Sequence, residues 1–193
     1  MNIVLARTML LATMAGMLLT GCATMSPEEC AVADWERIGE MDARSGQGMD
    51  YFARRASDCA DAGYPADQAA WTRGWDVGIT WFCTRNNGFR QGLNGYRYGQ
   101  ICPGHIEQEF LDGYETGYSI YQYGERIERT ASEIERERDR LADLQSEERP
   151  RDHEAIAETR DRLAVLRDRL RREELELARL EGLAQGQGFP VTL

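Results

Sequence analysis

The final third of the chain alternates apolar and charged residues with the seven-residue period of a coiled coil. Two arms carry this pattern, and the segment 146–152, which contains Pro150, separates them. Proline ends a helix and Asp152 supplies a cap for the next one, so the two arms predict an antiparallel helical hairpin over residues 125–184. The apolar positions are Ile127, Ile134, Leu141 and Leu144 in the first arm, and Leu163, Leu166, Leu170, Leu177 and Leu180 in the second.

Helix signals are shorter and closer together before residue 125. Ser26-Pro27-Glu28-Glu29 has the form of a capping box with proline in the first turn. Pro65 and Pro103 also precede helical patterns, and glycine and asparagine mark the breaks. We expect helices over 27–44, 50–62, 65–83 and from 103 onward, a turn at 86–88 and irregular chain at 92–101.

Pairs of glycines four residues apart occur twice beside aromatic residues. Gly74-Trp75-x-x-Gly78 and Gly113-Tyr114-x-x-Gly117 share the pattern, and residues at this spacing lie on one face of a helix. Each glycine costs a helix roughly 1 kcal/mol relative to alanine. The pattern therefore predicts a close helix crossing, with core packing that offsets this cost.

Composition changes sharply near residue 125. Residues 22–124 are rich in Gly, Cys and aromatic residues, whereas residues 125–183 contain no Cys and no aromatic residue. We predict an all-α protein in which a small, disulfide-braced helical domain at 22–124 precedes the coiled-coil hairpin. Glycines at 182, 186 and 188 end the pattern, so we expect a flexible tail at 185–193.

The N-terminal segment 1–21 has the anatomy of a secretory signal, with Arg7, an apolar run and small residues before a cut. Leu19-Thr20-Gly21-Cys22 looks like a bacterial lipobox, in which Cys22 is acylated and becomes the mature N-terminus. The alternative is an ordinary signal peptide cut nearby. An Asp after the lipidated cysteine usually retains lipoproteins in the inner membrane. Ala23 stands there, so we expect a lipid anchor on the periplasmic face of the outer membrane.

Four further cysteines follow, and an even number in an exported protein argues for disulfides. A zinc site is the alternative, but no Cys-x-x-Cys occurs and the compartment is oxidising. Three pairings are possible. We predict Cys30–Cys59 and Cys83–Cys102, because each pair joins neighbouring elements across a turn-rich segment.

Charge and motif content narrow the function classes. The net charge of −10 repels phosphate backbones, which argues against a nucleic-acid partner. His105 and His153 stand at an expected helix start and in the hairpin turn, neither in a motif with a Ser or Cys nucleophile. No His-Glu-x-x-His motif or phosphate-binding Gly-rich loop is present. We therefore expect no catalytic residue, no metal and no cofactor, with an envelope enzyme as the least favoured hypothesis.

Aromatic residues at helical spacing form two stripes. Trp71 and Trp75 belong to the first, and Tyr114 and Tyr118 to the second. Such stripes usually pack in a core. If exposed, they would offer a platform for the sugar rings of peptidoglycan, and their exposure distinguishes the two interpretations.

The order of cysteines, glycines and aromatic residues resembles an uncharacterised family of small Gram-negative lipoproteins, catalogued as domain of unknown function 2799. The resemblance spans about residues 22–145. It implies an envelope location and a four-cysteine framework, and it implies no activity, ligand or site. One departure follows Asp42, where the next glycine is Gly46 rather than the adjacent residue. The motifs are Cys30, Trp35-x-x-Ile38-Gly39-x-x-Asp42, Phe52, Cys59, Asp67, Trp71-x-x-Gly74-Trp75-x-x-Gly78-Ile79, Cys83, Gly92-x-x-Gly95-x-x-Tyr98, Cys102-Pro103 and Phe110-x-x-Gly113-Tyr114.

These observations favour a structural or scaffolding role through protein contacts, with a glycan-binding lipoprotein as the second hypothesis. The second arm of the hairpin has the longer apolar seam, so Leu175, Leu177 and Leu180 are expected to be partly uncovered. Uncovered apolar residues at helical spacing invite another helix. We expect the hairpin to bind a partner, by self-association or by docking to another envelope protein, while the lipid binds the membrane.

Overall fold

The computed structural model describes residues 23–146 and 152–191, and the regular secondary structure in these ranges is helical. The prediction of an all-α protein is confirmed. The helices form two compact units divided between Ile79 and Thr80, which we call unit 1 and unit 2. Within the described ranges, no helix is long and apolar enough to cross a membrane. Cys22 and the predicted signal segment lie outside the described residues.

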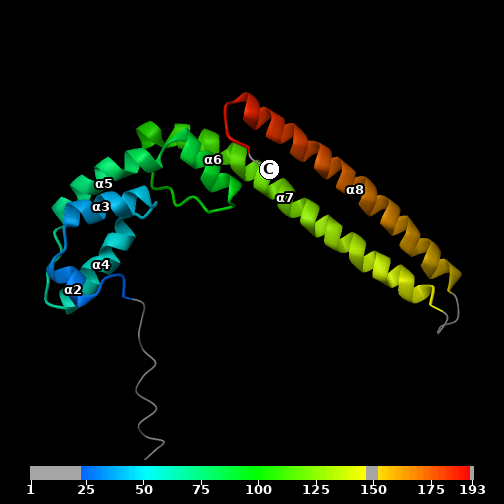
Figure 1. Cartoon of the computed structure of the whole chain (residues 1–193), viewed down its shortest axis with the longest axis horizontal. Coiled ribbons are helices and arrows are strands. Elements are labelled where there is room, and N and C mark those ends of the chain that lie inside the picture. The colour runs from blue at the N-terminus through cyan, green and yellow to red at the C-terminus, as the bar shows by residue number, and fades with distance from the viewer. Residues whose placement is uncertain (1–22, 147–151, 192–193) are drawn as a thin grey trace, which may run out of the picture. The chain divides into compact units, whose positions relative to one another are not determined.

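Unit 1 has an aromatic core closed by a disulfide. Trp35 meets Phe52 edge-on with ring centroids 5.9 Å apart, and Phe52 lies 5.1 Å from Trp71. The Cys30–Cys59 disulfide packs against the same core. The helices, blue to green in Figure 1, are α2 (Pro27–Ala31), α3 (Trp35–Arg44), α4 (Met49–Asp61) and α5 (Gln68–Phe82), whose last residues belong to unit 2.

The helix expected over 27–44 is interrupted in the structure. The capping box forms as predicted, because Ser26 Oγ accepts from the Glu29 amide at 3.2 Å and the Glu29 carboxylate accepts from the Ser26 amide at 2.8 Å. α2 nevertheless ends after five residues. Asp34 starts α3 by accepting the Arg37 amide at 3.1 Å, so one N-cap side chain divides the helix in two.

α3 and α5 cross with their backbones in direct contact. A Cβ added at Gly39, Gly74 or Gly78 would overlap a backbone carbonyl oxygen of the facing helix. The predicted packing role of Gly74 and Gly78 is therefore confirmed. Gly39 is the partner glycine, which the repeated pattern did not include.

The first helix that lies wholly in unit 2 occupies a segment where we expected a turn. Thr84 caps α6 (Arg85–Leu93) by accepting the Asn87 amide at 3.3 Å, and the Asn87 side chain donates to the Phe82 carbonyl at 2.8 Å. The turn expected at 86–88 is wrong, because the buried Asn87 side chain is satisfied inside the first turn of a helix. The Cys83–Cys102 disulfide forms as predicted and joins the start of α6 to the chain before α7 (Gly104–Leu144).

The crossing of α6 and α7 repeats that of α3 and α5 at constant sequence offsets. Gly39 faces the Trp71 carbonyl oxygen, and Gly88 faces that of Phe110. Gly39 and Gly88 are 49 residues apart in the sequence, and the residues that they face, Trp71 and Phe110, are 39 residues apart. Gly113 and Gly117 likewise face α6 as Gly74 and Gly78 face α3.

The turn that follows the first helix of each crossing pair, α3 in unit 1 and α6 in unit 2, is also repeated. Gly46 and Gly95, again 49 residues apart, end α3 and α6 with φ of 78° and 70°, a region in which glycine is favoured. In unit 1 the Trp75 indole donates to the Gln47 carbonyl at 2.8 Å. In unit 2 the Tyr114 hydroxyl donates to the Tyr96 carbonyl at 2.9 Å. Each unit is therefore built on the same crossing, turn and aromatic brace.

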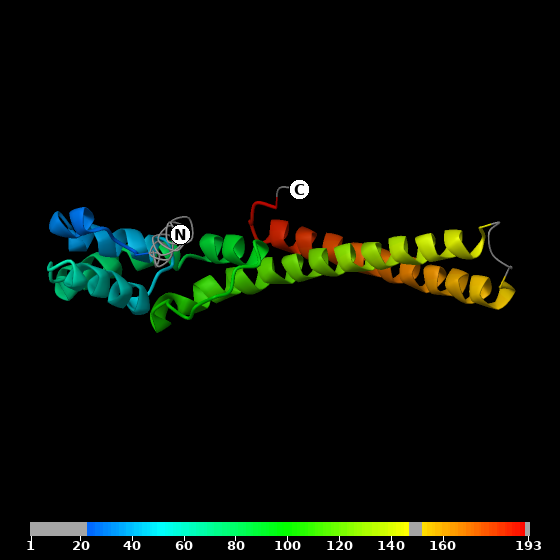
Figure 2. The same ribbon diagram turned by 90° about the horizontal axis from the view of Figure 1, so that it is seen from below.

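α7 and α8 (His153–Gly186) form the predicted antiparallel hairpin within unit 2, and Figure 2 shows them side by side. Asp152 caps α8 as expected, accepting the Ala155 amide at 3.0 Å, while Pro150 lies outside the described residues. α7 runs unbroken through residues 124 and 125. The change in composition at this point therefore does not coincide with a helix boundary. It marks where α7 leaves the glycine-rich crossing with α6.

The end of the chain is packed rather than loose, as far as the structure describes it. α8 continues to Gly186, and Phe189 is 3% exposed. The Phe189 ring stacks on Phe89 with centroids 4.3 Å apart, and the Arg85 guanidinium lies 4.4 Å over its other side. The prediction of a flexible tail at 185–193 is therefore wrong for the described residues up to Val191. The reason is that Phe189 follows the glycines and packs against Phe89.

Candidate functional site

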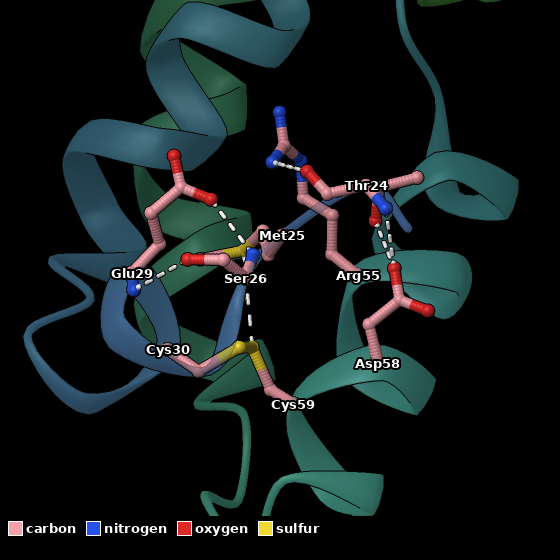
Figure 3. The surroundings of a disulfide bond; sticks show 8 residues. All are labelled: Thr24, Met25, Ser26, Glu29, Cys30, Arg55, Asp58 and Cys59. Atoms are coloured by element: carbon pink, nitrogen blue, oxygen red, sulfur yellow. Dashed lines mark hydrogen bonds between the residues drawn. A yellow bond between two sulfur atoms is a disulfide. The ribbon is translucent and has the colours of Figure 1, made fainter. Parts of the chain in front are cut away.

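The first described residues of the chain are bound to α4. The Thr24 amide and hydroxyl both donate to the Asp58 carboxylate, each at 2.6 Å. The Arg55 guanidinium donates to the Thr24 carbonyl at 3.1 Å. Figure 3 shows these contacts around the Cys30–Cys59 disulfide. We call Thr24, Met25, Arg55 and Asp58 the N-terminal clasp.

Met25 carries the clasp into the core of unit 1. Its side chain is buried, and its sulfur lies 3.9 Å from Cys59 Sγ. The capping box of Ser26 begins α2 at the next residue. From Thr24 onward the chain is therefore held by hydrogen bonds, a buried side chain and a helix cap in succession.

The electrostatics of the clasp favour a charged Asp58. Hydrogen bonds from the Thr24 side chain and amide, followed by the nearby Arg55, hold the pKa of the Asp58 carboxyl below its usual range. The Arg55 guanidinium also lies 4.7 Å from the centre of the Tyr51 ring, a cation–π contact. The lowered pKa therefore keeps the Asp58 carboxylate charged at neutral pH.

Arg55 links the clasp to a buried carboxylate in α3. Its Nη2 donates to Asp42 Oδ1 at 2.9 Å, and Asp42 is only 4% exposed. Asp42 Oδ2 accepts the Trp71 indole N–H at 3.0 Å. A buried carboxylate with both oxygens occupied in this way positions other groups, so the network ties the N-terminal segment to α3, α4 and α5.

A shallow groove of about 370 Å³ lies beside the clasp. Met25, Ile38 and Met41 contribute apolar side chains to it, and Glu29, Arg37 and Asp42 contribute charged ones. Val32 and Met41 at its rim are strongly exposed. Apolar rim residues next to the start of the described chain are suited to contact with another apolar surface.

The four aromatic residues named as glycan contacts are mostly committed to packing. Trp71 is fully buried, which removes it as a platform. Trp75 is half-buried and stacks on Trp71 with centroids 6.2 Å apart. Tyr114 and Tyr118 are half-buried members of a ladder of stacked rings along α7. The core interpretation therefore holds for Trp71 and accounts for the contacts of the other three.

A buried polar layer joins the two helices of the hairpin. The Thr130 hydroxyl donates to Glu173 Oε2 at 2.7 Å, and Glu173 Oε1 accepts from Arg169 at 3.1 Å. Thr130 is fully buried and Glu173 is 9% exposed. Polar residues at seam positions fix the register of paired helices. Leu177 and Leu180 are half-buried against the Phe89 cluster, which consists of Phe89, Ile120, Ala184 and Phe189. Leu175 is 67% exposed. The expectation of partly uncovered leucines therefore holds, most strongly for Leu175.

The pairing of the cysteines was predictable from the sequence, whereas the N-terminal clasp was not predicted. Asp42 appeared only as a member of the family pattern, and Arg55 and Asp58 had no motif around them. One local signal was present, since Arg55, Asp58 and Cys59 lie on consecutive turns of one amphipathic helix. His105 and His153 are both exposed, and the groups assembled here hold and orient the chain.

Residues 34–119 match the model of a family described as a protein of unknown function, DUF2799. This segment runs from the cap of α3 into α7 and contains both glycine crossings, so the resemblance drawn from the sequence is confirmed over that range. The departure after Asp42 places Ala43 opposite Gly78, which leaves room for the extra methyl group. No curated protein and no solved structure matches the chain.

Proposed function

We propose that this protein is a lipoprotein of the bacterial envelope, anchored through an acylated Cys22, and that its hairpin serves as a scaffold for protein contacts. The N-terminal clasp is the observation that carries the proposal. Thr24 is two residues after Cys22, a reach of at most about 7 Å. A lipid on Cys22 would therefore be joined to Asp58, Arg55 and the disulfide-braced core by a short connection and not by a long linker.

The cysteines support an oxidising compartment. All four cysteines after Cys22 are paired in two disulfides, and such bonds persist in the periplasm but are rare in the cytosol. Together with the lipobox and Ala23, this pairing favours the periplasmic face of the outer membrane as the location. Several acyl chains at about 0.8 kcal/mol per buried methylene would hold the protein there firmly.

The scaffolding role rests on the hairpin. Leucines and the Thr130–Glu173 layer lie in its inner seam, while Val165 and Leu175 are about two-thirds exposed on α8. Exposed apolar residues that recur on one face of a long helix are suited to contact with another helix. The glycan-binding alternative loses Trp71 from its platform, so the protein-contact role is the one we propose.

Metabolic labelling with a fatty acid tests the anchor. The wild-type protein should incorporate label and fractionate with membranes, and Cys22→Ser should lose both properties. A matched control replaces Cys30 and Cys59 with Ser, which removes a disulfide but leaves the lipobox intact, so labelling should persist. Equal labelling of wild type and Cys22→Ser would contradict the proposal.

A further inference from the structure

The outer face of α8 carries large apolar side chains in water. Val165, Leu175 and Leu183 are 65%, 67% and 49% exposed. They lie away from Leu163 and Ala184, which are buried, and Val165 also borders a groove between α8 and Glu133, Arg136 and Glu137 of α7. At 3.6 residues per turn the three exposed residues fall in one stripe about 80° wide.

Four charged residues lie between the apolar residues of this stripe, and the sign of their charge changes halfway along it. Asp161 and Asp168 occupy the N-terminal half, and Arg172 and Arg179 the C-terminal half. All four are exposed. An acidic half followed by a basic half on one face is complementary to a second copy of the same face running the opposite way.

The pattern is symmetric about Leu170 at every level. Asp168 and Arg172 each stand two residues from it, and Val165 and Leu175 each stand five residues from it. Further out, the pair Asp161 and Arg179 stands nine residues away, and the pair Ala157 and Leu183 thirteen. An antiparallel pair of α8 helices centred on Leu170 therefore brings acid opposite base and apolar opposite apolar in each layer.

We propose that α8 pairs with α8 of a second copy of this chain, antiparallel and centred on Leu170. The spacing of the stripe, in steps of three and four residues, is the one that antiparallel coiled coils use. A two-fold axis at the level of Leu170, passing between Asp168 and Arg172 on the stripe, makes the contact isologous, so it closes as a dimer. The inference rests on the proposed function and names the partner of the hairpin.

Two arginines beside the stripe would approach their own copies near the axis. Arg169 already binds Glu173 at 3.1 Å and lies 3.6 Å from Glu133, and Arg171 binds Asp168 at 3.3 Å. Their charges are balanced within their own chain, which reduces the repulsion across the axis. Exposed ion pairs are individually weak, so the dimer depends on the high effective concentration that confinement to a membrane provides.

Cysteine cross-linking in membranes tests the register. Full-length Val165→Cys and Leu175→Cys chains, expressed together, should give a disulfide-linked dimer on non-reducing gels. Either variant alone should not, because like positions are ten residues, roughly 15 Å, apart across an antiparallel pair. Arg167→Cys with Glu174→Cys, both exposed on the side of α8 away from the stripe, is the matched control and should give no dimer.

Charge exchange tests the recognition. When both cysteine chains also carry Asp168→Arg, four arginines meet at the centre and the dimer band should be lost. When one chain carries Asp168→Arg and the other Arg172→Asp, the acid–base layers are restored and the band should return. Circular dichroism of the variants checks that α8 remains folded.

Three outcomes would overturn the inference. They are a self-linked dimer of Val165→Cys alone, which indicates a parallel pair, no dimer in the mixture, or a link to a different protein. The membrane fraction of the same cells reports the anchor separately. A protein that stays on the membrane without α8 pairing refutes the self-pairing alone, whereas one found in the soluble fraction refutes the proposed function.

Discussion

Asp58 accepts both polar hydrogens of Thr24 and so determines whether the N-terminal segment stays on α4. Asp58→Ala should raise amide hydrogen exchange in the peptide that follows Cys22. Asp61→Ala changes an exposed acid on the same helix and should leave that exchange unaltered. Equal exchange in both variants would show that Met25 alone holds the segment.

The clasp should also respond to acid in a defined direction. Because the folded pKa of Asp58 is lowered, its stabilisation is fully present above the ordinary value of 3.8 and is lost as the pH falls through the lower folded value. Hydrogen exchange of the same peptide, measured across this range in wild type and Asp58→Ala, should converge only at low pH. A wild-type clasp that opened near neutral pH would contradict the assignment.

Tyr98 plays a comparable role in the loop before α7. Its hydroxyl accepts the Cys102 amide at 3.0 Å and donates to Glu107 at 2.9 Å, and burial raises its pKa to about 12. The stabilisation from the neutral phenol is fully present below 10 and is lost as the pH rises through about 12. Tyr98→Phe should cost about 1–3 kcal/mol by leaving the Cys102 amide unpaired. It should also remove the last-titrating phenol from the ultraviolet titration curve, and an unchanged curve would refute this role.

At the scale of elements, the glycine crossings determine how closely the helices pack. A Cβ at Gly117 would overlap the Phe89 carbonyl oxygen. A Cβ at Gly124, two turns further along α7, would meet open space. Gly117→Ala should therefore destabilise unit 2 by about 1–3 kcal/mol through overpacking. Gly124→Ala should stabilise it by about 0.5–1 kcal/mol through helix propensity. Thermal melts of the two variants should shift in opposite directions, and shifts of the same sign would exclude the crossing.

Helices and pairings that depend on local signals were predictable at this scale. The capping box at Ser26 and the cap at Asp152 follow from neighbouring residue types, and both disulfides follow from the order of the cysteines along the chain. α6 was missed because Asn-Asn-Gly has turn propensity, which the buried hydrogen bond of Asn87 overrides. Gly39 and Gly88 were missed because their partners are carbonyl groups of helices distant in sequence, and no residue type at the glycine itself identifies that partner.

At the scale of the whole molecule, the end of the chain completes unit 2. Phe189 covers Phe89, from which it is 100 residues removed in sequence, so no local pattern could indicate the contact. Phe189→Ala should cost about 3 kcal/mol, as loss of a buried aromatic ring does. Val191→Ala, at a half-buried neighbour, should cost clearly less. Equal melting temperatures of Phe189→Ala and wild type would return the tail to the loose state first expected.

The same contact changes how the hairpin should be studied. Deletion of residues 125–188 would strip Phe89 of its cover along with the binding surface, so a lost partner could reflect a damaged core. Substitutions on the outer face of α8 avoid this problem, because Val165 and Leu175 are exposed and lie away from the Phe89 cluster.

The central claim is that the chain is cut before Cys22 and acylated there, directly against the N-terminal clasp. Mass spectrometry of the N-terminal peptide of the membrane-extracted protein tests it most directly. The account predicts a peptide that begins at Cys22 and carries a diacylglyceryl group on sulfur. A peptide that begins at any other residue, or one that begins at an unmodified Cys22, would contradict it.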